Sequence, residues 1–181
     1  MAEKTATQGS AVARSRDEQT QPYQQKVTSF LWFNQNAEEA VNFYVSVFKN
    51  SRIRRTVHYG ETGHGAKGSV MIIDFVLDGQ EFTALNGGPE FKFNEAISLV
   101  VHCKTQEEVD YFWEKLSAGG GQIIECGWLK DKYGLSWQIV PDAFLELIRD
   151  DDPQKRDRAM KAMMKMKKLD VAELQRAVAA D

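Results

Sequence analysis

An internal repeat constrains the fold of this chain more than any other feature of its sequence. Residues 27–33 predict a buried strand followed by helical spacing of apolar residues, and the same pattern returns at residues 95–117. Shifting the first helix by 69 positions, from 38 to 107, places Glu38-Glu39 on Glu107-Glu108, and the same shift places Ser29 on Ser98. A duplicated supersecondary unit explains this agreement better than chance does.

Each copy continues into further strands. Residues 52–59 predict a second strand, and residues 69–86 predict two strands joined at Asp78-Gly79, a hairpin signal because both positions accept a positive φ. The second copy closes with two strands around a turn at residues 131–134. The sequence therefore predicts an α+β chain with two tandem β-α-β-β-β modules, at residues 26–89 and 94–141.

Both predicted helices begin with capping signals. Asn36 is followed three residues later by Glu39, and Thr105 is followed by Glu108 at the same spacing. This spacing is typical of a capping box, in which the first side chain accepts a hydrogen bond from the backbone of the first turn. We expect Asn36 and Thr105 to be the N-caps.

Two segments flank the modules. Residues 1–25 are polar and almost free of large apolar side chains, which predicts a disordered tail. Residues 142–181 predict a helical extension with a helix start at Asp152-Pro153. Residues 155–168 contain seven Lys or Arg and only one acidic residue, together with several methionines. We expect the methionine face, with Met160, Met163 and Met164, to pack on the sheet or across a dimer; the alternative is that the basic charge binds an acidic partner, nucleic acid or an anionic surface.

The charge balance and the cysteines exclude several classes of protein. Lys and Arg total 23 against 26 Asp and Glu, so the whole chain offers no basic footprint for nucleic acid or for an anionic membrane. Cys103 and Cys126 form no C-x-x-C motif, and no apolar run is long enough to span a bilayer. We expect a cytoplasmic protein that binds neither membrane nor nucleic acid.

Three strings, LWFNQNAEEAVNFY, TALNGGPEFKFNEAIS and CGWLKDKYGLSWQIVP, resemble the PhnB-like branch of the glyoxalase/bleomycin-resistance (vicinal oxygen chelate) superfamily. This branch often carries the label of a 3-demethylubiquinone-9 3-methyltransferase domain, and the resemblance covers roughly residues 26–180. It implies that the paired modules form a curled mixed-sheet cup, often within a homodimer. It does not settle a reaction.

The resemblance also implies where a divalent metal would be held. By strand position the ligand sites fall at Ser29, Ala96, Gln138 and one position within Thr83–Asn86. None of these is a histidine or an acid, and serine, alanine and an amide do not replace imidazoles and carboxylates as ligands. We expect no metal and no other cofactor, which argues against glyoxalase I or dioxygenase activity.

The other candidate motifs favour structural interpretations. Gly119-Gly120-Gly121 follows a predicted helix and enters a strand, the reverse of the turn that an α/β methyltransferase uses for its cofactor. His58 and His102 stand alone at strand ends, and Cys126 has no neighbouring base in sequence. The methyltransferase label is therefore not supported by a motif.

Alternation along the first and last strands predicts which side chains line the cup. If Gln138 points into the cup, Ser136 does as well, while Trp137 faces the helices. The same rule sends Phe30 and Trp32 outward on the first strand. The predicted ligand-binding residues are Ser29, Leu31, Phe33, Asn86, Ser136 and Gln138.

Two hypotheses about function follow. In the first, the protein binds a small, mostly apolar or aromatic molecule without a metal, because the predicted cup is apolar with a few neutral hydrogen-bonding groups. In the second, it is a lyase or isomerase on a small oxygenated substrate, oriented by Gln138 and Asn86. A DNA-associated role through the basic C-terminal helix is a third and weaker alternative.

Overall fold

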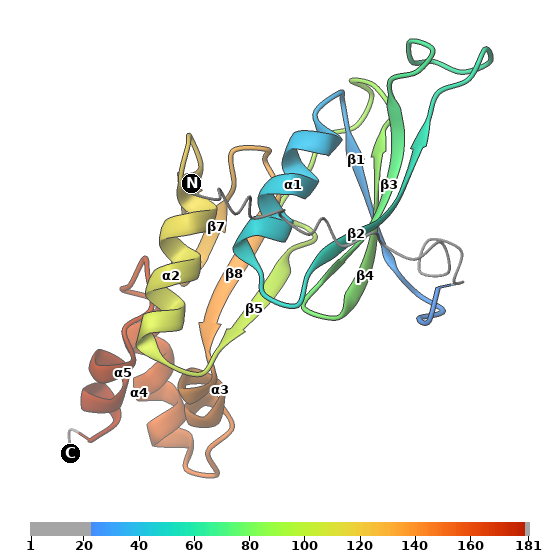
Figure 1. The fold of residues 1–181 in the computed structure, drawn as a ribbon. Helices are drawn as coiled ribbons and strands as arrows, with labels where there is room; N and C mark the ends of the chain where they lie inside the picture. The colour runs from blue at the N-terminus through green and yellow to red at the C-terminus, as the bar shows by residue number, and fades with distance from the viewer. Residues whose placement is uncertain (1–22, 180–181) are drawn as a thin grey trace, which may run out of the picture.

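The computed structural model describes residues 23–179 as two modules lying side by side, followed by three helices packed at the end of the second module (Figure 1). The elements of the first module are β1 (Ser29–Phe33), α1 (Ala37–Val47), β2 (Arg52–His58), β3 (Val70–Leu77) and β4 (Gln80–Asn86). Those of the second are β5 (Leu99–Cys103), α2 (Gln106–Ser117), β6 (Gln122–Ile123), β7 (Trp128–Lys130) and β8 (Ser136–Pro141). The C-terminal helices are α3 (Asp142–Ile148), α4 (Pro153–Met163) and α5 (Val171–Ala179).

The two sheets have the same topology. The first has strand order β1-β4-β3-β2 and the second β5-β8-β7-β6, with the first and last strands of each module paired in parallel. The other pairs are antiparallel. The α+β fold of paired β-α-β-β-β modules with C-terminal helices is therefore confirmed.

The local signals of the sequence had different outcomes. Asp78 and Gly79 have φ values of 44° and 85°, as expected at the hairpin. Thr105 accepts a hydrogen bond from the Glu108 N–H, as expected. Asn36 occupies the N-cap position of α1, as expected, but its backbone (φ −113°, ψ 21°) is not extended and its side chain makes no capping bond. Asn86 Oδ1 accepts the Ala37 N–H instead, at 2.9 Å.

One hydrophobic core joins the two modules. The side chains of α1 that face it are fully or almost fully buried, as are Phe75 of β3, Leu116 of α2 and Ile139 of β8. Phe48 lies between Phe112 and Trp137, with ring centroids 5.0 and 5.5 Å apart and nearly parallel planes. The modules therefore pack through aromatic side chains from both, and this contact fixes their mutual arrangement.

The C-terminal helices form a second, smaller core. It contains Val140, Phe144, Met166, Leu169 and Leu174. Backbone hydrogen bonds from Cys126 to Met166 and from Gly127 to Lys167, at 2.8 and 2.7 Å, fasten the segment after α4 to the loop before β7. Among the described helices, none has the length and apolar character needed to span a bilayer.

Candidate functional site

The predicted cup residues on β1 face the opposite way from the expectation. Leu31 and Phe33 are 7% and 3% exposed and lie in the core that α1 covers. Phe30 is 59% exposed, and strand alternation places Trp32 on the same face as Phe30. The expected orientation of this strand is corrected: Leu31 and Phe33 are core residues and Phe30 lies on the face away from α1.

The two modules differ in the length of one connecting loop, which the 69-residue repeat does not take into account. β1 and β5 end at Phe33 and Cys103, which are 70 positions apart, whereas α1 and α2 begin at Ala37 and Gln106, which are 69 apart. The link between strand and helix is thus one residue shorter in the second module. An alignment of Ser29 with Ser98 therefore displaces the strand by one residue, and such a shift turns every side chain to the other face.

The predicted residues of β8 do lie as expected. Trp137 is 2% exposed and packs toward the helices, and Ser136 and Gln138 lie on the other face of the strand. Gln138 Nε2 donates to Ser98 Oγ at 2.8 Å. Ser136 is fully buried, and its hydroxyl oxygen has no hydrogen-bond partner within residues 23–179.

The six predicted residues do not gather at one place. Asn86 stands at the start of α1, where Oδ1 accepts the Ala37 N–H and Nδ2 donates to the Val70 carbonyl at 3.0 Å. Ser29 lies at the start of β1 on the α1 side, half-buried, and Ser136 and Gln138 belong to the second sheet. Their role in ligand binding stays a prediction.

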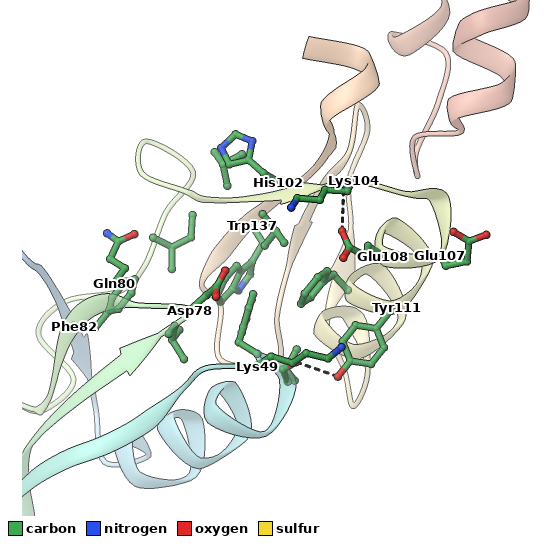
Figure 2. A pocket seen from close by; sticks show the side chains of 17 residues that line it. Lys49, Asp78, Gln80, Phe82, His102, Lys104, Glu107, Glu108, Tyr111 and Trp137 are labelled. Carbon is green, nitrogen blue, oxygen red and sulfur yellow. Dashed lines mark hydrogen bonds between the residues drawn. The ribbon is translucent and has the colours of Figure 1, made fainter. Parts of the chain in front are cut away.

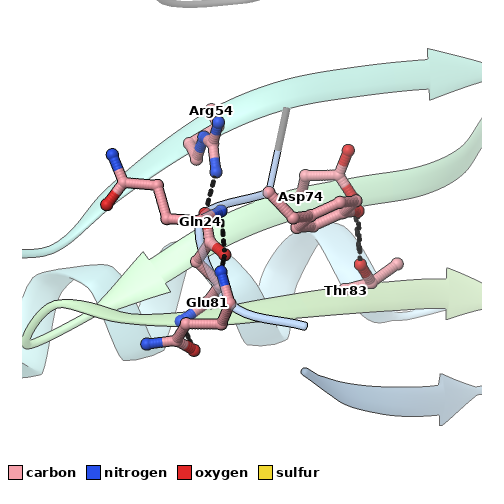
Figure 3. Close-up of polar contacts among 7 residues, drawn as sticks. Gln24, Arg54, Asp74, Glu81 and Thr83 are labelled. Atoms are coloured by element: carbon pink, nitrogen blue, oxygen red, sulfur yellow. Dashed lines mark hydrogen bonds and ion pairs between the residues drawn. The ribbon is translucent and has the colours of Figure 1, made fainter. Parts of the chain in front are cut away.

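A buried polar cluster lies on the face of the first sheet away from α1 (Figure 3). We call it the β4 polar cluster, and its members are Arg54, Asp74, Glu81 and Thr83. Glu81 and Thr83 are only 4% and 5% exposed. Glu81 forms an ion pair with Arg54, and Thr83 donates to Asp74 Oδ1 at 3.0 Å.

Residues 23–25 cross this cluster and supply its remaining hydrogen bonds. Tyr23 donates its hydroxyl proton to Asp74 at 2.6 Å, and the backbone N–H groups of Gln24 and Gln25 both donate to Glu81 Oε2 at 2.9 Å. The Gln25 N–H is the main cause that lowers the pKa of the Glu81 carboxyl below its ordinary value. The tail predicted for residues 1–25 is thus in contact with the sheet at its last three residues, and residues 1–22 lie outside the described part of the chain.

Sequence reasoning missed this cluster, although a signal for it exists. In QEFTALN, the β4 residues Glu81 and Thr83 alternate with Phe82 and Ala84, so the polar pair belongs to one face. Both polar side chains are buried, and a buried carboxylate requires partners. A search for those partners would have pointed to the basic strand β2.

A groove of about 730 Å³ lies between the modules (Figure 2). We call it the intermodule groove. It runs between the β3–β4 hairpin of the first module and strand β5 with helix α2 of the second. Its apolar lining includes Phe48, Phe82, Leu99, Val101, Phe112 and Trp137. The volume and the apolar lining are those of a small-molecule pocket.

Polar groups surround the mouth of this groove. Lys49 and Lys104 line it and have no ion-pair partner among residues 23–179. His102 also lines it, and its Nδ1 lies 4.0 Å from the Asp142 carboxylate. Tyr111 donates to the Val47 carbonyl at 3.0 Å, which holds α2 against the end of α1. The groove thus combines an apolar interior with two lysines unpaired within the described residues, one imidazole and the carboxyl groups of Asp78, Glu107 and Glu108.

The two cysteines offer no activated nucleophile. Burial, followed by the negative charges of Glu108 and Asp142, raises the pKa of the Cys103 thiol to about 12, so the thiol stays protonated. Cys126 is half-buried in the loop before β7 with φ 61°, and its N–H bonds to Met166. The structural interpretation of both cysteines is the better supported one.

The side chains do not fit the divalent metal that the resemblance implies. Ser29 lies on the core side of β1, Ala96 is an exposed loop residue, and Gln138 is bonded to Ser98. Within residues 23–179, no group of three or more His, Cys, Asp or Glu is arranged to hold a metal ion. Serine, alanine and a glutamine amide at these positions do not supply the imidazole and carboxylate ligands that such a metal needs.

Comparisons with known proteins place the chain in a family. A family model described as 3-demethylubiquinone-9 3-methyltransferase matches residues 25–140. A PhnB protein from Bacillus cereus is 42% identical with a TM-score of 0.60, over 65% of this chain and 99% of that one. Protein PA1353 from Pseudomonas aeruginosa is 17% identical with a TM-score of 0.55, over 65% of this chain and 97% of that one, a likeness of fold alone. No curated protein sequence matches the chain.

Proposed function

The chain belongs to the 3-demethylubiquinone-9 3-methyltransferase family of PhnB-like proteins, as its motifs predicted, and we propose that it binds a small, largely apolar molecule in the intermodule groove. One observation carries the proposal: a groove of about 730 Å³ with an aromatic floor made by Phe48, Phe112 and Trp137. Small-molecule sites commonly combine such a volume, an apolar lining and a few polar groups. Binding would need no metal.

The family label does not extend to methyl transfer in this proposal. A methyltransferase of the common α/β type uses a glycine-rich turn from a strand into a helix. Gly119, Gly120 and Gly121 instead lie between the end of α2 and the start of β6. The proposal therefore concerns binding, and a methyl-donor cofactor is not part of it.

A thermal-shift screen with a library of small apolar and aromatic metabolites tests the proposal. Leu99 is half-buried in the groove lining, so Leu99→Trp should fill the groove and abolish the stabilisation by any hit. Ile97→Trp is the matched control, since Ile97 is 75% exposed and lies outside the groove. If Leu99→Trp lowers the melting temperature of the free protein, Gln80→Trp replaces it as the variant that fills the groove, because Gln80 is an exposed residue of the groove lining. Hits that both groove variants still bind would refute the site.

A lyase or isomerase activity is the second candidate, and the position of His102 favours it. His102 lines the edge of the groove on the face of β5 opposite to Leu99 and Val101, and with the Asp142 carboxylate 4.0 Å from its Nδ1 it is the candidate general base for an oxygenated substrate that reaches this edge. His102→Asn should then remove turnover of a groove-binding hit while leaving its affinity unchanged. Turnover that survives His102→Asn contradicts this role.

We also propose that two copies of the chain associate as a homodimer. α1 and α2 each pack on one face of their own sheet, and the opposite faces expose Phe30 at 59% and Val100 at 44%, although α3 packs against Val140 at the end of β8. β1 and β5 are edge strands, which offer backbone groups to a partner. Sedimentation should give a dimer that Phe30→Asp with Val100→Asp converts to a monomer. A wild-type monomer at all concentrations would contradict the proposal.

A further inference from the structure

The C-terminal extension exposes two methionines beside two lysines. Met160 and Met164 are 39% and 66% exposed and stand four positions apart, so they lie on one side of α4 and its last turn. Lys161 directly follows Met160, Lys165 directly follows Met164, and both lysines are exposed. We call these four residues the basic methionine patch.

Packing within the extension does not use this patch. The small core of the extension is built by Phe144, Met166, Leu169 and Leu174 together with Val140 of β8. α4 buries Ala159 against its neighbours, and it contacts both α3 and α5. The face that carries Met160 and Met164 is therefore left to solvent after the helices have packed. The expectation that the methionines of this helix pack inward holds for Met163, which is partly buried against this core, but not for Met160 and Met164.

The lysines of the patch differ from the other cations of the segment. Lys155 and Lys168 pair with Asp150 and Asp110, and Arg156 and Arg158 donate to backbone carbonyls. Lys161 and Lys165 have no such partner within the described residues, and neither has Lys167. Four of the seven cations thus have structural contacts, and the remaining three leave a local positive charge around exposed thioethers.

We propose that the basic methionine patch docks an acidic amphipathic helix of a partner protein. Methionine side chains adapt to the shape of apolar anchors, and free lysines complement acids that flank those anchors. A nucleic acid fits less well, because the segment offers only three free cations and no aromatic residue for base stacking. The patch also lies outside residues 25–140, which match the family model, so it adds an interaction to the common domain.

Fluorescence anisotropy with the full-length chain tests the proposal. The probe is a labelled helical peptide of about 18 residues with leucines on one face and glutamates around them. Lys161→Glu with Lys165→Glu should weaken its binding by about tenfold or more. Met160→Ser with Met164→Ser should weaken it by a similar factor without changing the salt dependence. Both pairs change only exposed side chains, so the fold is retained.

Matched controls and a competing probe complete the experiment. Lys26→Glu with Lys92→Glu changes the net charge equally at exposed positions outside the patch and should leave the affinity within about twofold. A DNA duplex of about 20 base pairs is titrated in parallel. The proposal is overturned if the peptide does not bind, or if the control pair weakens binding as much as the patch lysines do. It is also overturned if the duplex binds more tightly than the peptide while the methionine variants bind the peptide like the wild type.

Discussion

Asp131 should be the most sensitive single position for the stability of the two-module core. Its side chain is 3% exposed and accepts four hydrogen bonds. Tyr44 Oη of α1 and Trp137 Nε1 of β8 donate to Oδ2 at 2.7 and 2.8 Å. The backbone N–H groups of Tyr133 and Leu135 donate to Oδ1 at 2.8 and 3.1 Å. One carboxylate therefore joins the first helix to the turn and last strand of the second module.

Asp131→Ala would leave buried donors without an acceptor. Tyr44 and Trp137 are 0% and 2% exposed, so water does not replace the lost oxygen. An unsatisfied buried donor costs about 1–3 kcal/mol, so two such donors sum to about 2–6 kcal/mol, and we expect a loss of about 3–5 kcal/mol in the free energy of unfolding. Burial raises the pKa of the Asp131 carboxyl, and this cost of burying the charge is recovered when the carboxyl is removed, which keeps the loss below the simple sum.

Urea denaturation followed by tryptophan fluorescence and by circular dichroism measures this loss. Asp131→Asn retains one acceptor oxygen and should lose only about 1–2 kcal/mol. Tyr44→Phe should cost about 1 kcal/mol in the wild type but little in the Asp131→Ala background, where the hydroxyl is already unsatisfied. A loss below about 1 kcal/mol for Asp131→Ala, or equal costs of Tyr44→Phe in both backgrounds, would refute the reasoning.

Three further predictions concern other parts of the chain. Iodoacetamide at neutral pH should label Cys126 and leave Cys103 unmodified until the protein unfolds, because the pKa of Cys103 is raised to about 12; equal labelling by mass spectrometry would contradict this. The pKa of the Glu81 carboxyl is lowered by folding, so its contribution to stability is complete at a pH above the ordinary pKa of 4.5 and is lost as the pH falls through the folded-state pKa. Glu81→Gln should therefore flatten the acid limb of a plot of melting temperature against pH. Gly127→Ala should lower the free energy of unfolding by about 1–3 kcal/mol, since φ is +81° and the new Cβ would lie 3.0 Å from the Ile139 carbonyl oxygen; an unchanged urea midpoint would contradict it.

Signals carried within a few residues predicted the structure well. The Asp78-Gly79 hairpin, the Thr105 cap and the helix start at Asp152 all depend on neighbouring residues, and all three are present. The orientation of β1 depends on something else. SFLWF is apolar at four of its five positions, so alternation along the strand does not indicate its buried face. The buried face is seen only in the tertiary packing, where Leu31 and Phe33 lie in the core with the α1 side chains. The link from β1 to α1 has three residues, 34–36, whereas the link from β5 to α2 has two, 104–105, so the repeat does not transfer the facing of one strand to the other.

Contacts between distant residues account for the rest of what the sequence did not reveal. Asn86 caps α1 from 49 positions away, and Gln24 and Gln25 reach Glu81 across 57 and 56 positions. No local pattern encodes such pairs. Asn36 stands at the N-cap position, but Asn86 supplies the side-chain acceptor, because Asn86 at the end of β4 pairs with Phe33 at the end of β1 and so lies beside the helix start. Tertiary position here overrides local propensity.

The strand registers favour the intermodule groove over the sheet faces as the proposed ligand site. Leu31 pairs with Ala84 and Val101 with Ile139, so Thr83 and Gln138 are equivalent positions on the two faces away from the helices. Thr83 is already bonded within the β4 polar cluster, and Gln138 is bonded to Ser98. A ligand at either face must first displace these internal hydrogen bonds, whereas a ligand in the intermodule groove displaces only solvent. Hydrogen exchange with a bound hit should therefore show protection along β5 and the β3–β4 hairpin turn and none at the centre of β4. Protection at Thr83 instead would move the site to the sheet face.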